Sequence, residues 1–186
     1  MPKLIDTDSL FQATIEVFAE RGYDALTTQE VARRAGINEV TIYRRFGTKA
    51  ALVGAALAHG LSTAPFARLS VSDDLEADLL AMADAFQATT RVFGGVVTVL
   101  LVEVPRHPEL REAMAPLLVN LSRAVSVLEA HQRSDRLAPG DPWQQLALLL
   151  SPFLAGGLWA RAGVAPTVEV DTGDVVAAFL DGHRAR

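Results

Sequence analysis

Apolar residues recur three and four positions apart along most of the chain, and this spacing predicts helices. The clearest stretch is 75–90, where Leu75, Leu79, Met82 and Phe86 mark one face of an amphipathic helix. Further helices are predicted at 49–62, 109–133, 142–161 and 174–183, and loops at 63–73 and 134–141. The predicted fold class is therefore all-α.

Segment 92–104 is almost wholly apolar and rich in β-branched residues, so its composition also suits a buried strand. Its place in an otherwise helical chain favours a fully buried helix, which Pro105 and Pro108 would end. We expect Pro116 to kink the helix that follows.

Two short helices joined by a glycine turn are predicted between positions 27 and 46. Thr27 and Glu30 fit a capping box, which starts the first helix. Gly36 follows that helix at once and permits a tight turn through positive φ. Asn38 is a suitable cap for the second helix, whose inner face would hold Ile42 and Phe46. This arrangement can place one helix in the major groove of DNA.

Positive charge is gathered where the second of these helices would meet a phosphate backbone, although the chain is acidic with a net charge of −5. Window 33–49 holds five basic residues and one acidic residue, whereas positions 1–60 as a whole hold seven of each. Such clustering is typical of a small domain that binds DNA.

Residues 11–57 resemble the N-terminal DNA-binding region of the TetR (tetracycline-repressor) family of transcription regulators. The resemblance rests on ATIEVFAERGYDALTT, EVARRAG and TIYRRFGTKAAL. It implies a three-helix helix-turn-helix domain at 1–48, followed by a helical ligand-binding and dimerisation domain at 49–186. The expected function is a repressor that binds a palindromic operator as a homodimer and is released by a small hydrophobic effector. A transcriptional activator, or a ligand-independent DNA-binding protein of the same fold, is the alternative.

The resemblance also implies which residues contact DNA. Thr41, Tyr43 and Arg44 match positions on the helix that reads DNA, and Lys49 matches a lysine that meets a phosphate. Thr48 would cap the helix that begins at Lys49. The full predicted set is Thr27, Thr28, Gln29, Arg33, Asn38, Glu39, Val40, Thr41, Tyr43, Arg44, Arg45 and Lys49.

Glu39 and Val40 depart from the family pattern, so we expect operator specificity to lie there. Val40 could contact a thymine methyl, and Glu39 could accept a hydrogen bond from a cytosine amino group. Alternatively, Glu39 only favours the positive end of the helix dipole. Arg33 and Arg34 are either exposed charges or intramolecular partners of Glu30 or Glu16.

The last two helices are predicted to form the dimer interface, because the family resemblance implies a four-helix contact between subunits. Segment 142–161 is apolar on more than one face, which indicates burial on several sides. A monomer core is the alternative. The predicted interface residues are Leu146, Leu150, Phe153, Leu154, Gly157, Leu158, Val175, Val176, Phe179 and Leu180.

The resemblance places an effector pocket among the middle helices, and the aliphatic character of that region suggests a hydrophobic ligand. The candidate lining residues are Met82, Phe86, Phe93, Leu100, Glu103, His107, Leu118, Leu121 and Trp159. Segment 106–110, RHPEL, resembles a helix junction of the family and is expected to be structural.

Several classes of protein are disfavoured by what the sequence lacks. There are no cysteines, no glycine-rich phosphate loop, no G-x-S-x-G and no HExxH, so no enzymatic activity, metal or cofactor is expected. A sequence-independent DNA-coating protein would ordinarily be basic throughout, whereas this chain has a net charge of −5, so that class is disfavoured. With no signal peptide and no run of 18 apolar residues, we expect a cytoplasmic protein without a membrane span.

Overall fold

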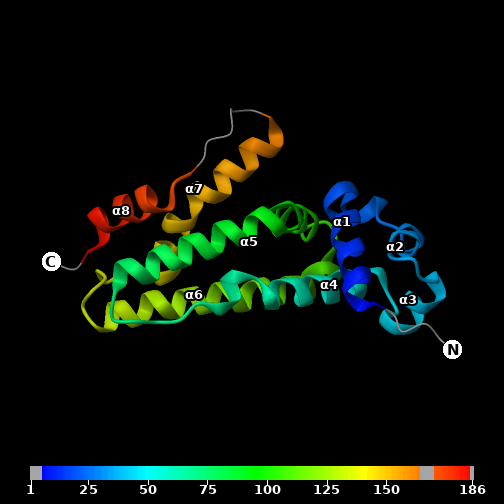
Figure 1. The fold of residues 1–186 in the computed structure, drawn as a ribbon, viewed down its shortest axis with the longest axis horizontal. Helices are drawn as coiled ribbons and strands as arrows, with labels where there is room; N and C mark the ends of the chain where they lie inside the picture. Colours follow the sequence, from blue (N-terminus) through cyan, green and yellow to red (C-terminus); the bar gives the residue numbers. More distant parts are fainter. Residues whose placement is uncertain (1–5, 164–169, 185–186) are drawn as a thin grey trace. The chain divides into compact units, whose positions relative to one another are not determined.

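The computed structural model describes residues 6–163 and 170–184, and the described chain is built from helices (Figure 1). No β-strand occurs in these residues; Leu137 and Arg184 form an isolated bridge. The all-α prediction is confirmed. The elements are α1 (Thr7–Ala25), α2 (Thr28–Ala35), α3 (Glu39–Phe46), α4 (Lys49–Thr63), the 3-10 helix η1 (Pro65–Arg68), α5 (Leu75–Glu103), the 3-10 helix η2 (Pro108–Met114), α6 (Ala115–Arg133), α7 (Pro142–Ala162) and α8 (Thr172–His183).

The chain forms two compact units, Met1–Thr63 with Gly95–Leu118 and Ala64–Gly94 with Val119–Arg186. Both units therefore contain part of α5 and part of α6. Helix α4 belongs to the first unit, where it packs against α1 and η2. The functional division at residue 48 stays a prediction, because compactness does not show which residues bind DNA or ligand.

The first unit has a core formed by one face each of α1, α2, α3 and α4. Leu10, Val17, Phe18, Ile42 and Leu52 are at most 1% exposed. Apolar burial of this kind stabilises a small helical unit more than helix propensity does.

Near the end of α1 the backbone turns at Gly22, whose φ of 74° lies in the left-handed region. A Cβ atom at this position would lie 2.9 Å from Oε1 of Glu103 on α5. Glycine thus serves both the backbone conformation and the close approach of that carboxylate.

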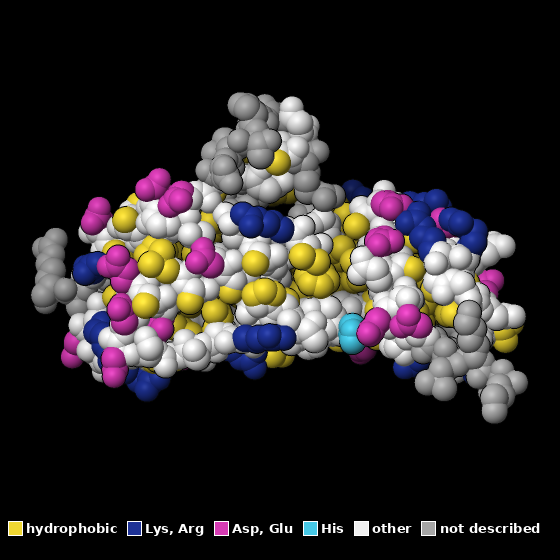
Figure 2. All heavy atoms as spheres, in the orientation of Figure 1, with side chains coloured by type: hydrophobic (Ala, Val, Ile, Leu, Met, Phe, Trp, Pro, Cys, Tyr) yellow, Lys and Arg dark blue, Asp and Glu magenta, His cyan; other side chains and the backbone are white. Residues whose placement is uncertain are grey.

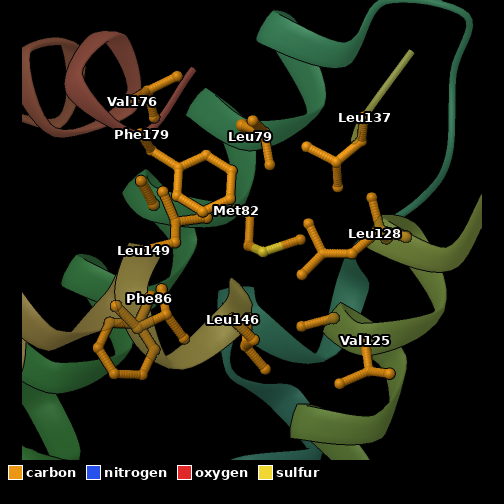
Figure 3. Close-up of a cluster of buried hydrophobic side chains, with 14 of the residues drawn as sticks. Leu79, Met82, Phe86, Val125, Leu128, Leu137, Leu146, Leu149, Val176 and Phe179 are labelled. Carbon is orange, nitrogen blue, oxygen red and sulfur yellow. The ribbon is translucent and has the colours of Figure 1, made fainter. Parts of the chain in front are cut away.

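The second unit has its own apolar core, in which side chains from four helices point toward one another (Figure 3). Met82 of α5, Leu128 of α6, Leu149 of α7 and Val176 of α8 are all fully buried. The predicted spacing of Leu75, Leu79, Met82 and Phe86 is confirmed as the buried face of α5.

Three local expectations need correction. Segment 92–104 is helical, but it is not fully buried, because Val92, Leu101 and Val102 are 68%, 50% and 55% exposed. It continues the preceding helix as part of α5, and its buried residues, Val96 and Leu100, lie four positions apart on one side. Pro116 does not kink a helix; it lies in the first turn of α6, where its missing N–H costs nothing. The predicted loop at 63–73 contains η1.

Two segments, Leu75–Glu103 and Pro108–Arg133, are long and apolar enough to cross a membrane by length and composition alone. The sequence has no uninterrupted run of 18 apolar residues, yet these two segments are apolar enough on average to pass. Core helices of proteins that never enter a membrane pass the same test, so the finding is weak support for a span.

Candidate nucleic-acid interface

Helices α2 and α3 form the predicted helix-turn-helix, and local side chains determine its ends. Thr27 Oγ1 accepts a hydrogen bond from the Glu30 amide at 3.2 Å, which caps α2. Gly36 then adopts φ 65°, and its amide bonds to the carbonyls of Ala32 and Arg33. Asn38 Oδ1 accepts from the Val40 amide at 2.9 Å and starts α3. The Thr27 and Asn38 caps and the Gly36 turn are observed as predicted. The capping box is only half formed, because the Glu30 carboxylate binds arginines and not the Thr27 amide.

The outer face of α3 carries Val40, Tyr43 and Arg44, at positions i, i+3 and i+4. Val40 is 70% exposed and Tyr43 is 53% exposed, and Arg44 is also exposed. Ile42, on the opposite face, is 1% exposed and anchors the helix to the core. One helix thus presents an apolar, an aromatic and a cationic side chain together to the solvent.

Glu39 does not project freely from the start of α3. Its Oε1 accepts a 2.5 Å hydrogen bond from the hydroxyl of Thr28, the first residue of α2. Thr28 is only 5% exposed, so this part-buried contact links the beginnings of the two helices. The negative charge also lies in the first turn of α3, where the helix dipole favours it.

Arg33 and Arg34 bind carboxylates within the chain. Arg33 contacts Glu30 at 2.8 Å, and Arg34 contacts Glu30 at 3.0 Å and Glu20 at 2.6 Å. Figure 2 shows basic and acidic side chains intermixed over α2. The interpretation as intramolecular partners of Glu30 is confirmed for both arginines; their second partner, where present, is Glu20, not Glu16. Hydrogen bonds from Arg33 and then Arg34 lower the pKa of Glu30 to about 2.

Arg45 and Lys49 have internal contacts but keep donors available. Arg45 bonds to Thr7 Oγ1 at 3.2 Å, and its guanidinium lies 5.4 Å from the Phe46 ring. Lys49 Nζ donates to the Tyr23 carbonyl at 2.7 Å and lies 4.2 Å from the Tyr23 ring centre. An ammonium has three donors, so this contact leaves others for a phosphate.

The remaining predicted DNA-contact positions lie at the starts of helices. Thr27, Gln29 and Asn38 are exposed, and Thr41 is half-buried on α3. Thr48 Oγ1 accepts from the Ala51 amide at 3.1 Å, as expected of a cap for α4. No set of His, Cys, Asp or Glu residues that could hold a metal occurs in the part of the chain described.

The predicted pocket residues divide between the two units. Met82 and Phe86 lie in the core of the second unit, which also includes Leu121 at its margin. Trp159, of the same unit, is 53% exposed. Phe93 is a half-buried member of the second unit, and the first unit holds Leu100, Glu103, His107 and Leu118. The structure therefore does not gather the predicted set within either unit.

His107 has a structural setting that agrees with the expectation for RHPEL. Its Nε2 lies 3.2 Å from Oδ1 of Asp24 and 3.3 Å from Oε2 of Glu103. Its ring centre is 4.7 Å from that of Tyr23. This imidazole joins the end of α1 to the end of α5. No pattern in the sequence pointed to Tyr23, which lies against both Lys49 and His107.

Six of the ten predicted interface residues lie in the chain's own core, at most 6% exposed, and offer a partner almost no surface: Leu146, Leu150, Phe153, Val176, Phe179 and Leu180. Val175 is half-buried against that core. Leu154 and Leu158 are 44% and 47% exposed, and Gly157 is exposed as well. The reachable part of the predicted interface is therefore the outer face of α7.

The capped helix pair with its exposed outer face defines a helix-turn-helix DNA-binding protein. Residues 10–56 match the family described as bacterial regulatory proteins, tetR family. The chain belongs to this family of transcriptional regulators.

Curated relatives agree with this assignment. The uncharacterised HTH-type transcriptional regulator Rv1556 of Mycobacterium tuberculosis is 31% identical over 127 residues, which is 68% of this chain and 62% of that protein. The chain thus spans about three fifths of the length of such relatives. The HTH-type transcriptional repressor Rv3405c of the same species is 43% identical over 51 residues, 27% of each protein.

Solved structures share the fold over nearly the whole length. The flavonoid-responsive regulator FrrA has a TM-score of 0.69 at 22% identity, and 97% of each chain is covered. A transcriptional regulator from Rhodococcus sp. RHA1 has a TM-score of 0.72 at 22% identity, covering 96% of this chain and 97% of that one.

Proposed function

We propose that the protein is a ligand-responsive transcriptional repressor that binds a palindromic operator as a homodimer in the cytoplasm. The observation that carries the DNA-binding part is the outer face of α3. Val40, Tyr43 and Arg44 are exposed there, on a helix that Ile42 anchors in the core. The N-terminal residues of such a helix contact base edges, and its flanking cations contact phosphates.

Repression is supported by the name of the relative Rv3405c, which is called a transcriptional repressor. An activator, or a ligand-independent DNA-binding protein, would use the same DNA-binding helices and is the alternative. A regulator needs no catalytic group, and we propose that the protein has no enzymatic activity.

Dimerisation is supported by exposed apolar side chains on α7. Leu148, Leu154 and Leu158 are 52%, 44% and 47% exposed, and they recur along one side of the helix with Ser151 between them. Such a stripe is typical of a helix that packs against a partner. A two-fold dimer would place two copies of α3 about one turn of DNA apart, so that a palindrome is read.

Release by a small hydrophobic effector is supported by the apolar composition of α5 and α6 and by the structural neighbour FrrA, which is called a flavonoid-responsive regulator. An effector must bind one state of the dimer more tightly than the other, because equal affinity shifts no population. We propose that α4 transmits the change, since it begins at Lys49 beside α3 and packs against η2.

An electrophoretic shift assay with the DNA upstream of the protein's own gene tests this proposal. We expect a discrete complex at low salt without ligand, and a weaker complex with an effector found by screening hydrophobic compounds. If no specific duplex is bound under these conditions, the repressor proposal fails. If DNA is bound but no transcription is repressed in a reporter strain, the activator alternative replaces it.

A further inference from the structure

Val40 is the most exposed of the large hydrophobic side chains in the described structure, at 70%. It lies in the first turn of α3, next to Tyr43 and Arg44 on the outer face. Core packing does not explain a valine here, because Ile42 supplies the buried contact. Helix propensity does not explain it either, because a β-branched residue is a weaker helix former than alanine or lysine.

Glu39, the neighbour of Val40, has its carboxylate engaged elsewhere. One oxygen accepts from the Thr28 hydroxyl, which comes from a residue that is 5% exposed. A carboxylate that is bonded to α2 is not available to hydrogen-bond with base edges. If it were turned outward, the DNA phosphates would repel its charge. The adjacent amide of Val40 is fixed by Asn38 Oδ1. The first turn of α3 is thus held in place by two residues that directly precede Val40.

We propose that Val40 reads the C5 methyl group of a thymine in each operator half-site, and that Glu39 is a positioning residue that holds α3 on α2 through Thr28. This inference rests on the proposed DNA-binding function. The thymine methyl is the apolar group exposed in the major groove, so an exposed valine at the start of the inserted helix matches it chemically. Specificity at this position then depends on shape and apolar contact.

The methyl contact is tested by replacing thymine with deoxyuridine, which removes only that methyl group. The probe is a duplex selected by the full-length protein from a random-sequence pool, with each thymine of the half-site replaced in turn. At one thymine position we expect about fourfold weaker binding, the effect of losing one buried methyl-sized contact. Replacing that thymine in both half-sites should weaken binding about fifteenfold, because distant sites act additively.

Val40→Ala should remove this discrimination, so that the variant binds the thymine and deoxyuridine duplexes equally. Val92→Ala is the matched control, because Val92 is also an exposed helical valine, at 68%, and lies on α5. It should keep the fourfold ratio. Equal binding of both duplexes by the unaltered protein at every thymine, or a fourfold ratio retained in Val40→Ala, overturns the Val40 assignment.

The role of Glu39 is tested by its effect on base preference. Glu39→Ala and Thr28→Val should each weaken binding to every operator variant by the same factor, and the double variant should be no worse than either single one. Glu39→Gln should restore binding, because its amide oxygen still accepts from Thr28. If Glu39→Ala abolishes the preference at a single G·C pair instead, Glu39 reads that base and the positioning role is wrong.

The proposed function and the assignment of Val40 fail in different ways. If the unaltered protein selects no duplex from the pool, the proposed DNA-binding function fails. If it selects an operator that shows no methyl dependence, only the assignment of Val40 fails.

Discussion

Arg44 and Arg33 are both exposed arginines of the helix-turn-helix, yet the structure separates them. Arg33 binds Glu30 through two hydrogen bonds, whereas Arg44 makes no hydrogen bond or ion pair with any residue that the structure describes. An arginine that is already paired with a carboxylate neutralises DNA phosphates poorly, so it displaces few counterions from the DNA. Arg44 is therefore the better phosphate or base ligand of the two.

We expect Arg44→Ala to weaken operator binding about tenfold, and to reduce the dependence of log affinity on log salt by about one unit. Arg33→Ala is the matched control and should leave the salt slope unchanged. Fluorescence anisotropy measures the operator affinity of both variants at salt concentrations between about 50 and 200 mM, which gives the two salt slopes. Equal slopes for the two variants would contradict the distinction.

Among individual residues, the sequence predicted those whose role depends on near neighbours in the chain. It did not predict contacts between residues far apart in the sequence. The caps at Thr27 and Asn38 and the glycine at 36 follow from rules that act within a few residues. The bond between Thr28 and Glu39 spans 11 positions, and that between Lys49 and Tyr23 spans 26. Such contacts depend on how helices pack, and no spacing in the sequence announces them.

Helices α1 and α2 are joined by the charge network around Glu30, which binds Arg21, Arg33 and Arg34. Because the pKa of Glu30 falls from 4.5 to about 2 on folding, its ionised form is favoured in the folded state. This contribution to stability is present above pH 4.5 and is lost as the pH falls toward 2.

Glu30→Gln should therefore lower the thermal midpoint at pH 7, and the difference from the unaltered protein should shrink as the pH falls below 4.5 and disappear near pH 2. Glu16→Gln, an exposed carboxylate of α1 outside this network, is the control. Thermal unfolding followed by circular dichroism gives the midpoints. A difference that is constant with pH would show that the network does not act through ionised Glu30.

Helices α5 and α6 are joined by a buried pair, in which His131 Nε2 lies 2.8 Å from Oδ2 of Asp78. His131 is fully buried, and its Nδ1 has no hydrogen-bond partner among the described residues. Burial raises the pKa of Asp78, but hydrogen bonds from Ser72 and His131 outweigh burial and leave that pKa lowered.

Asp78→Ala leaves the buried imidazole without a hydrogen-bond partner in the described part of the chain, so we expect a loss of about 1–3 kcal/mol in the free energy of unfolding. Asp84→Ala, an exposed acidic residue on the same helix, should change stability by less than about 0.5 kcal/mol. Urea denaturation at pH 7 measures both. Equal midpoints for the two variants would contradict a stabilising role for the pair.

Helix ends that depend on a cap or a proline were predicted well, as at α7, whereas other bounds were not: the helix expected at 75–90 continues to Glu103, and the α-helix expected from 109 begins at Ala115. The α7 helix was expected at 142–161 and runs Pro142–Ala162. The exposure of Val92, Leu101 and Val102 was not predicted, since an all-apolar segment does not indicate which of its sides will pack. Most of the pocket residues were chosen by the same apolar character, with Glu103 and His107 added as polar groups, and the set divides between two units.

On the scale of the whole molecule, the proposed reading of a palindrome requires two copies of the chain. The apolar stripe on α7 supplies the reachable surface, whereas the buried leucines beneath it support the helix from inside. Sequence alone could not separate these two layers, because both consist of leucines at helical spacing.

Leu154→Glu combined with Leu158→Glu should convert the dimer into a monomer and weaken operator binding by at least about a hundredfold, because a single half-site loses the gain from simultaneous engagement. Val92→Glu, a charge placed on another exposed apolar position, should leave the dimer intact. Sedimentation velocity gives the oligomeric state. A monomeric unaltered protein, or a dimer that survives both glutamates, would contradict the interface.

Sequence-specific DNA binding through α3 is the central claim, and competition at fixed salt tests it most directly. The affinity for the selected operator is compared with that for a scrambled duplex of the same length and composition. We predict a preference of at least about a thousandfold, which Tyr43→Ala should leave nearly unchanged while it weakens both affinities alike. Equal affinity for the two duplexes would contradict the claim.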